Sequence, residues 1–199
     1  MAKTAGILFD PDGFTDSAKA ATTYLQARGF SVLRQPFKMS STVADVPRFP
    51  SKLDLMAWYS HGGWDGPVFL SDSTTEFPGQ VSPDEPMEWV QLMTYFKRQM
   101  NPKGLFVVHA CHAAGSDSLE KKQDAKKGRP KEDRIWIRDV AKHMDVYSFG
   151  QAGLSGAANV ATVRLLLAFA LTGKAKGYPF LAFAPGGDQM KKSSDWPKR

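Results

Sequence analysis

The sequence predicts a three-layer α/β/α sandwich with a mainly parallel central sheet. Short apolar runs rich in β-forming residues alternate along the chain with longer segments of helical spacing, and this alternation is typical of parallel strands joined by helical crossovers. Two runs, at 52–60 and 104–108, are almost continuously apolar, as expected of strands buried on both faces. The length of 199 residues suits a single domain, and no repeat or linker divides residues 1–199.

Turn signals and apolar spacing assign the elements in order. The first strand ends at the turn sequence Asp10-Pro-Asp-Gly. The helix after it is expected to start at Thr15 or Asp16 and to stop at Gly29, and the last helix is expected to end at Gly173. The expected strands are 5–9, 30–37, 52–60, 104–108, 145–153 and 179–187, and the expected helices are 15–29, 84–100, 135–144 and 157–173.

The positive charge of the chain is concentrated in two segments. The formal net charge is +6, but much of the excess lies in a charged loop at about 116–134, expected to be exposed, and in a polar C-terminal tail from about 186. The remainder is close to neutral and contains no basic strand pair studded with aromatic residues. We therefore expect no nucleic-acid partner.

The cysteine content and the apolar runs indicate the compartment. A single cysteine excludes an intrachain disulfide and favours a reducing environment. The longest apolar run, 160–173, is interrupted by Arg164 and is shorter than the roughly 20 residues that span a bilayer. No secretion signal is visible. We expect a soluble, cytoplasmic protein with no membrane partner.

Reactive side chains follow the two strands that are expected to be most deeply buried. One strand ends at His61, followed by Gly62 and Gly63, and the other ends at His109 and Cys111. Because the carboxyl ends of parallel strands meet at one edge of a sheet, His61 and Cys111 are expected to face each other. A thiol with an imidazole partner is the minimum for nucleophilic catalysis.

These two segments, "LDLMAWYSHGGWDG" and "GLFVVHACHAAGSDS", resemble the active-site segments of caspase–legumain-type (clan CD) cysteine peptidases. The pattern in that superfamily is an apolar strand ending in His-Gly, then a second ending in Ala-Cys. The resemblance implies one caspase-like peptidase domain, an endopeptidase that hydrolyses peptide bonds through a thioester. It implies His61 as catalytic histidine, Cys111 as nucleophile, and the Gly62 and Cys111 backbones as the oxyanion site. Peptides or proteins would be the substrates, and no cofactor is expected.

The same resemblance suggests where substrate specificity resides. It implies that His109, two residues before the cysteine, lines the pocket for the P1 residue. Asp10 and Asp12, in the loop after the first strand, would add negative charge to that pocket and favour a basic P1 residue, although they equally suit a turn. Ser148 and Gln151 are candidates to contact the substrate backbone. A basic-specific enzyme could also cut itself in the Lys- and Arg-rich loop at 116–134.

Two other functions remain open from the sequence. The chain could be a non-catalytic caspase-like module that binds a protein partner through the same cleft, because a lone cysteine such as Cys111 is often only a small buried hydrophobe. It could also be a metal-dependent hydrolase using His61, His109 and Cys111. The absence of a second cysteine and of a familiar metal-ligand spacing leads us to expect no metal. The sequence does not indicate an oligomeric state.

Overall fold

The computed structural model describes residues 3–37, 46–50, 52–63, 66–68, 86–117, 121–122, 135–154, 159–174 and 177–197. The strands are β1 (Lys3–Phe9), β2 (Phe30–Pro36), β3 (Leu53–Tyr59), β4 (His61–Gly63), β5 (Gly66–Val68), β6 (Met100–His109), β7 (Tyr147–Gln151) and β8 (Phe180–Phe183). The helices are α1 (Pro11–Gln26), α2 (Pro86–Gln99), α4 (Trp136–Met144), α5 (Val160–Thr172) and the short 3₁₀ helix η2 (Ser193–Asp195).

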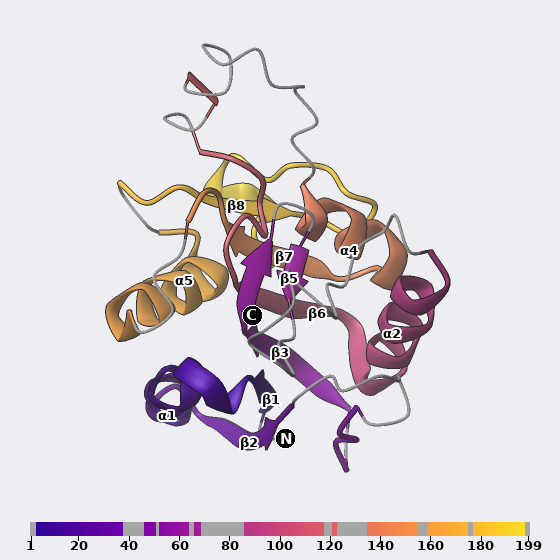
Figure 1. Ribbon diagram of the computed structural model, residues 1–199, viewed down its shortest axis with the longest axis vertical. Helices are drawn as coiled ribbons and strands as arrows, with labels where there is room; N and C mark the ends of the chain where they lie inside the picture. Colours follow the sequence, from indigo (N-terminus) through magenta and orange to yellow (C-terminus); the bar gives the residue numbers. More distant parts are fainter. Residues whose placement is uncertain are drawn as a thin grey trace.

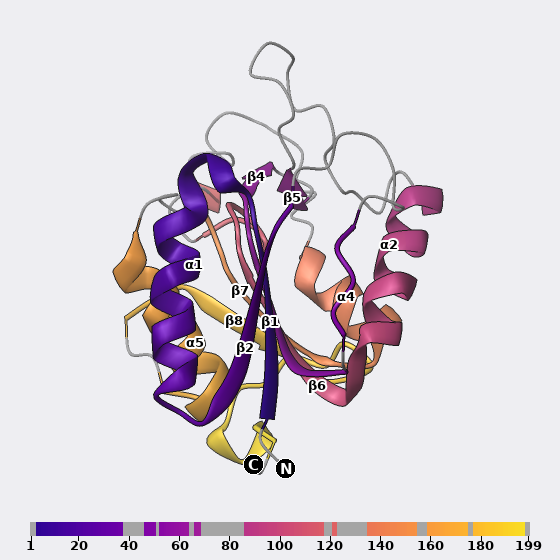
Figure 2. The ribbon, with the colours of Figure 1, turned by 90° about the horizontal axis from the view of Figure 1, so that it is seen from below.

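Six strands form the central sheet, in the order β2-β1-β3-β6-β7-β8. All neighbouring pairs are parallel except β7 and β8, which are antiparallel. Helices α1 and α5 cover one face, and α2 and α4 cover the other (Figures 1 and 2). The predicted three-layer α/β/α arrangement with a mainly parallel sheet is therefore confirmed.

Each predicted strand and helix has a counterpart, but three features differ from expectation. Strand β6 begins at Met100 rather than Gly104, and its pairing with β3 shifts register near its start. A short antiparallel hairpin, β4–β5, follows β3 and contains the His-Gly-Gly sequence. Helix α1 begins at Pro11, four residues early. Local hydrogen bonds account for that early start.

The start of α1 combines a helix cap with the turn that the sequence indicated. The Asp10 side chain accepts a hydrogen bond from the Asp12 backbone N–H at 2.9 Å, which satisfies one of the unpaired donors at a helix N-terminus. Asp12 and Gly13 then leave the helical conformation, with Gly13 at φ +94°. The regular part of the helix starts only at Phe14, close to the predicted Thr15.

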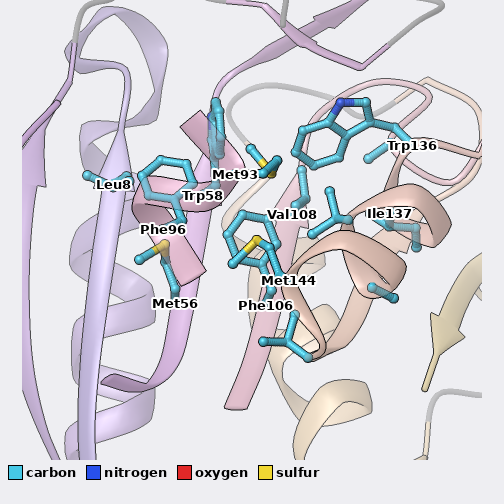
Figure 3. Packing of buried hydrophobic residues seen from close by; sticks show 14 of the residues in the cluster. Leu8, Met56, Trp58, Met93, Phe96, Phe106, Val108, Trp136, Ile137 and Met144 are labelled. Atoms are coloured by element: carbon cyan, nitrogen blue, oxygen red, sulfur yellow. The ribbon is translucent and has the colours of Figure 1, made fainter. Parts of the chain in front are cut away.

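The centre of the sheet is buried on both faces because β3 from Leu55 to Tyr59 and β6 from Leu105 to Val108 are continuously apolar. Between Leu55 and Tyr59, successive residues contribute alternately to the core under α1 and α5 and to the core under α2 and α4, as the period of two in a strand requires. Figure 3 shows the α2/α4 side, where Trp58 packs edge-on against Phe96 and Trp136, with ring centroids 5.4 Å and 5.8 Å away.

The C-terminal segment is part of the folded structure, although the sequence suggested a polar tail from about residue 186. Met190 is buried, and its N–H donates to the carbonyl of Ala182 in β8 at 2.9 Å. Trp196 packs on Phe169 of α5 and donates its indole N–H to the Phe169 carbonyl at 3.0 Å. Two apolar residues in a charged sequence are therefore enough to hold this segment against the α5 side.

Most of the predicted charged loop, 118–120 and 123–134, lies outside the described residues. Lys121 and Lys122, which the structure does describe, are exposed. Within the described part of the chain, no helix has the length and apolar character needed to cross a membrane.

Candidate functional site

The parallel pairing of β3 and β6 brings His61 and Cys111 to the same place. Tyr59, the last residue of β3, is paired with His109, the last residue of β6. The Ser60 N–H continues this pairing by donating to the His109 carbonyl at 3.3 Å. His61 and Cys111 each follow two residues after that matched pair, so they leave the sheet at its carboxyl edge side by side.

Gly62 lies directly against the backbone of Cys111. A β-carbon at position 62 would come within 2.2 Å of the Cys111 carbonyl oxygen and 2.5 Å of its nitrogen. Contacts below 3.0 Å are essentially never made by a real β-carbon, so only glycine fits here. The structure therefore brings together three of the predicted site residues, His61, Gly62 and Cys111.

Backbone hydrogen bonds hold the turn that carries Cys111. His112 has a left-handed conformation with φ 53°, which is uncommon outside glycine. Its N–H donates to the Gly153 carbonyl at 2.9 Å, its carbonyl accepts from Gly115, and the Ala114 N–H donates to the Gln151 carbonyl at 3.0 Å. These hydrogen bonds to the end of β7 and the residues after it fix the position of Cys111. Backbone in such an uncommon conformation clusters at functional sites.

The imidazole of His61 rests on the first turn of α1. Its ring meets the Phe14 ring edge-on, with centroids 5.2 Å apart and an interplanar angle of 86°. A β-carbon at Gly13 would lie 4.0 Å from His61 Nε2. Both His61 and Cys111 are half-buried, so a solvent-accessible thiol and imidazole share one edge of the sheet. Sequence reasoning missed Phe14, and the only signal was an aromatic residue directly after the Asp-Pro-Asp-Gly turn.

His109 is placed differently from its expected role in a pocket. Its side chain is 0% exposed and packs between the rings of Phe14 and Tyr59. Neither ring nitrogen has a hydrogen-bond partner among the described residues, and burial lowers the pKa of His109 to about 4. The ring is therefore neutral near pH 7 and does not cancel any charge of Asp10 or Asp12, as an imidazolium beside them would.

The two aspartates of the predicted pocket separate into different environments. Asp10 is 1% exposed and acts as the helix cap described above, and its N–H donates to the Tyr59 carbonyl at 2.9 Å. Asp12 is exposed and directly precedes Gly13, which neighbours the His61 ring. Of the two residues, only Asp12 is exposed at the surface.

Ser148 and Gln151, the two candidates on β7, are both buried. Ser148 is 0% exposed and its hydroxyl donates to the carbonyl of Ile137 in α4, so it serves the packing of α4 on the sheet. Gln151 is 8% exposed. Its Nε2 donates to the Leu154 carbonyl at 2.7 Å, and its backbone carbonyl supports the Cys111 turn. The structure therefore brings Gln151 to the site as a support and leaves Ser148 in the core.

The described residues contain no group of three or more His, Cys, Asp or Glu side chains that could hold a metal ion. What the site does contain is a thiol, an imidazole, and backbone N–H groups next to a glycine that allows close approach. Such a set can perform acyl transfer, because backbone N–H groups can stabilise the negative charge that develops on a carbonyl oxygen.

Comparison with known proteins adds little to this description. No family model matches the chain, and no curated protein matches it. Among solved structures, a flavodoxin from the domain Archaea is similar at 10% sequence identity and a TM-score of 0.34, covering 82% of this chain and 92% of the flavodoxin.

Proposed function

We propose that this protein is a caspase-like cysteine endopeptidase with a His61–Cys111 dyad. The observation that carries the proposal is the junction of β3 and β6, where Gly62 packs on the Cys111 backbone. This junction unites the two sequence motifs that resemble the peptidase superfamily. The half-buried His61 and Cys111, the supported turn after Cys111 and the absence of a β-carbon at residue 62 are compatible with acyl transfer by a positioned thiol, an imidazole and backbone donors.

The reaction follows from the roles that the residues can take. The Cys111 sulfur, as a thiolate, attacks the carbonyl carbon of the scissile peptide bond, and the carbonyl oxygen takes up negative charge. The C–N bond then breaks, and the departing amine receives a proton from the His61 imidazolium. A thioester to Cys111 remains. Water, deprotonated by His61, adds to the thioester, the C–S bond breaks, and the acid product leaves.

Geometry also favours a role for backbone N–H groups in holding the oxyanion. The Cys111 nitrogen lies under the Gly62 backbone, and the turn that contains it is held by hydrogen bonds from residues 112 to 115. Removing one preorganised donor of this kind lowers kcat by about 10²–10³-fold. The Gly62 and Cys111 N–H groups are the donors that we assign to this role.

The charge around the site supports only a modest preference for substrates with a basic P1 residue. His109 is neutral, so it leaves any negative charge near the site uncancelled. Asp12 is exposed and directly precedes Gly13, the neighbour of the His61 ring, so its carboxylate is the one that we assign to a basic substrate side chain. Cleavage of the chain itself in the loop at 116–134 belongs to the same proposal, although most of that loop lies outside the described residues.

The proposal is tested by labelling and cleavage with matched variants. Purified wild type, Cys111→Ala, His61→Gln and the control His143→Gln are exposed to a peptide acyloxymethyl ketone with lysine at P1, and covalent adducts are counted by intact mass spectrometry. We expect wild type and His143→Gln to form a single adduct. Cys111→Ala should form none, and His61→Gln should react at least tenfold more slowly. A fluorogenic peptide library run on the same four proteins then reports cleavage and P1 preference.

Two outcomes would replace the proposal. Equal, slow labelling of wild type and His61→Gln, with no peptide cleaved, would favour the non-catalytic binding module. Cleavage that survives in Cys111→Ala and disappears with a chelator would favour the metal-dependent hydrolase. Samples are kept reduced throughout, because the proposed nucleophile is the single cysteine of the chain.

A further inference from the structure

A hollow lies on the α2 side of the molecule, away from His61 and Cys111. It has a volume of about 710 Å³ and lies between α2 and the segment that leads into β3. Because Lys52 directly precedes β3 and Gln99 ends α2, the hollow is at the amino edge of β3, opposite the carboxyl edge that carries His61. Figure 2 shows this segment running beside α2. Its lining includes Arg48, Phe49, Lys52, Tyr95, Arg98 and Gln99.

Three cations surround this groove, and none of them has an ion-pair partner among the described residues. Arg48, Lys52 and Arg98 are all exposed, and the ion pairs found in the described part of the chain include none of them. A cation in the last turn of a helix, as Arg98 is, also complements the negative end of the helix dipole. Arg48 and Lys52 come from another segment and have no such role. Their convergence makes the groove locally positive.

The groove is a built feature of the fold. The Phe49 N–H donates to Gln99 Oε1 at 2.8 Å, and the Tyr95 hydroxyl donates to the Val46 carbonyl at 3.1 Å. Phe49 is 4% exposed and lies over Gly6 of β1, where a β-carbon would come within 2.8 Å of its ring. Two hydrogen bonds and one buried ring therefore fix the segment against α2.

The amide of Gln99 provides an independent sign of a ligand. Gln99 is 7% exposed, and its oxygen is assigned as the acceptor from Phe49. Its Nε2 is buried and has no hydrogen-bond partner in the part of the chain that the structure describes. A buried donor without a partner costs roughly 1–3 kcal/mol. In the wall of a positively charged groove, an anionic oxygen would satisfy it.

We propose that this groove binds a small phosphate-bearing molecule that contains a flat ring, the chemistry of a nucleotide. Arginine guanidinium groups match phosphate oxygens in bidentate geometry, and Arg48 and Arg98 supply two of them. The half-buried ring of Tyr95 offers a face for stacking. The volume is within the range of about 300–1,000 Å³ that small-molecule sites occupy. Nothing in this proposal depends on the activity at Cys111.

Calorimetric titration of the full chain tests the proposal, with ADP, inorganic phosphate, adenosine and an acidic peptide as probes. We expect ADP to bind more tightly than phosphate or adenosine. Its affinity should fall as the salt concentration is raised. Gln99→Glu keeps the oxygen that accepts from Phe49 and replaces the donor with a negative charge. It should reduce ADP affinity at least about tenfold, since a charge-assisted hydrogen bond is worth roughly 1.5–3 kcal/mol.

Variants of exposed cations provide the second arm. Arg48→Gln with Arg98→Gln should lower ADP affinity by about tenfold or more, while Lys19→Gln with Arg28→Gln, exposed on the α1 side, should leave it unchanged. Circular dichroism checks that each variant is folded. No ADP binding at millimolar concentration, equal binding in all variants, or tighter binding of the acidic peptide than of ADP would each overturn the proposal.

Discussion

The backbone of Gly62 lies against the backbone of Cys111 so closely that a side chain at position 62 would overlap the Cys111 carbonyl oxygen. This contact joins β4, which follows β3, to the turn after β6, and it is the contact on which the proposed chemistry depends.

Gly62→Ala should therefore disturb the site more than the fold. The added methyl group cannot be accommodated without moving the Cys111 turn, so we expect labelling of Cys111 by the P1-lysine probe to fall at least tenfold. Gly29→Ala is the control, because no atom lies within 4 Å of the β-carbon position of Gly29, and its φ of +79° alone makes a side chain unfavourable there. The control should lose roughly 1–2 kcal/mol of stability and keep its labelling rate. Equal labelling of all three proteins would contradict the assigned role of Gly62.

Phe14→Leu should slow the reaction without weakening substrate binding. The Phe14 ring meets the His61 ring edge-on and is 1% exposed, so a smaller side chain gives the imidazole room to turn. We expect kcat to fall severalfold while KM changes little, because positioning acts in the transition state. Phe30→Leu, in the same core but at the start of β2, is the comparison. It should lose a similar 1–3 kcal/mol of stability with kcat unchanged.

His109 should make the fold sensitive to acid. Burial lowers its pKa from 6.5 to about 4 in the folded chain, so between these values the unfolded chain binds more protons. Stability is therefore full above about pH 6.5 and is lost as the pH falls toward 4, by at most roughly 3 kcal/mol. Urea unfolding of wild type and His109→Met at pH 7.5 and pH 5 measures this difference.

We expect His109→Met to lose much less stability than wild type between the two pH values. Met has a similar volume and no polar atoms to leave unpaired in this apolar site. The pKa of His143 is also lowered, by partial burial and by the charge of Lys97, so it contributes in the same direction. Both proteins should therefore be compared in a His143→Gln background. Parallel pH dependence with and without His109 would refute the assignment.

Asp10 and Asp12 should affect different properties. Asp10→Ala removes the cap of α1 and should cost about 1 kcal/mol or more, whereas Asp10→Asn keeps a capping oxygen and should cost less. Asp12→Asn should leave thermal stability almost unchanged, but it should lower kcat/KM for substrates with lysine at P1 relative to those with leucine. If Asp12→Asn leaves that ratio as it was, the preference for a basic residue does not come from this carboxylate.

The sequence was sufficient for the layers and for the meeting of His61 with Cys111. Continuous apolar runs indicate buried parallel strands, and parallel strands end at a common edge. It could not place His109, because period-two alternation assigns a face of the strand but not the depth of burial. Whether His109 would reach the surface depended on Phe14, which arrives from α1 and covers it.

Hydrogen bonds between distant segments were also beyond the sequence. The contact of Phe49 with Gln99 joins residues 50 positions apart, and Ser148 bonds to a helix carbonyl in α4. No local pattern encodes either contact. The packing of Trp196 could not be predicted for the same reason. A tryptophan in a charged segment becomes buried only when a distant residue such as Phe169 packs against it.

The chain that follows β8 folds back along that strand, with a bridge between Phe183 and Gln189 and a hydrogen bond from Ala184 to Asp188. The segment after β8 thus covers this edge strand of the sheet. Natural β-proteins cover edge strands in this way to prevent pairing between molecules. A foreign strand that extended this sheet would have to join at β2, and there the last residue, Pro36, has no N–H to offer.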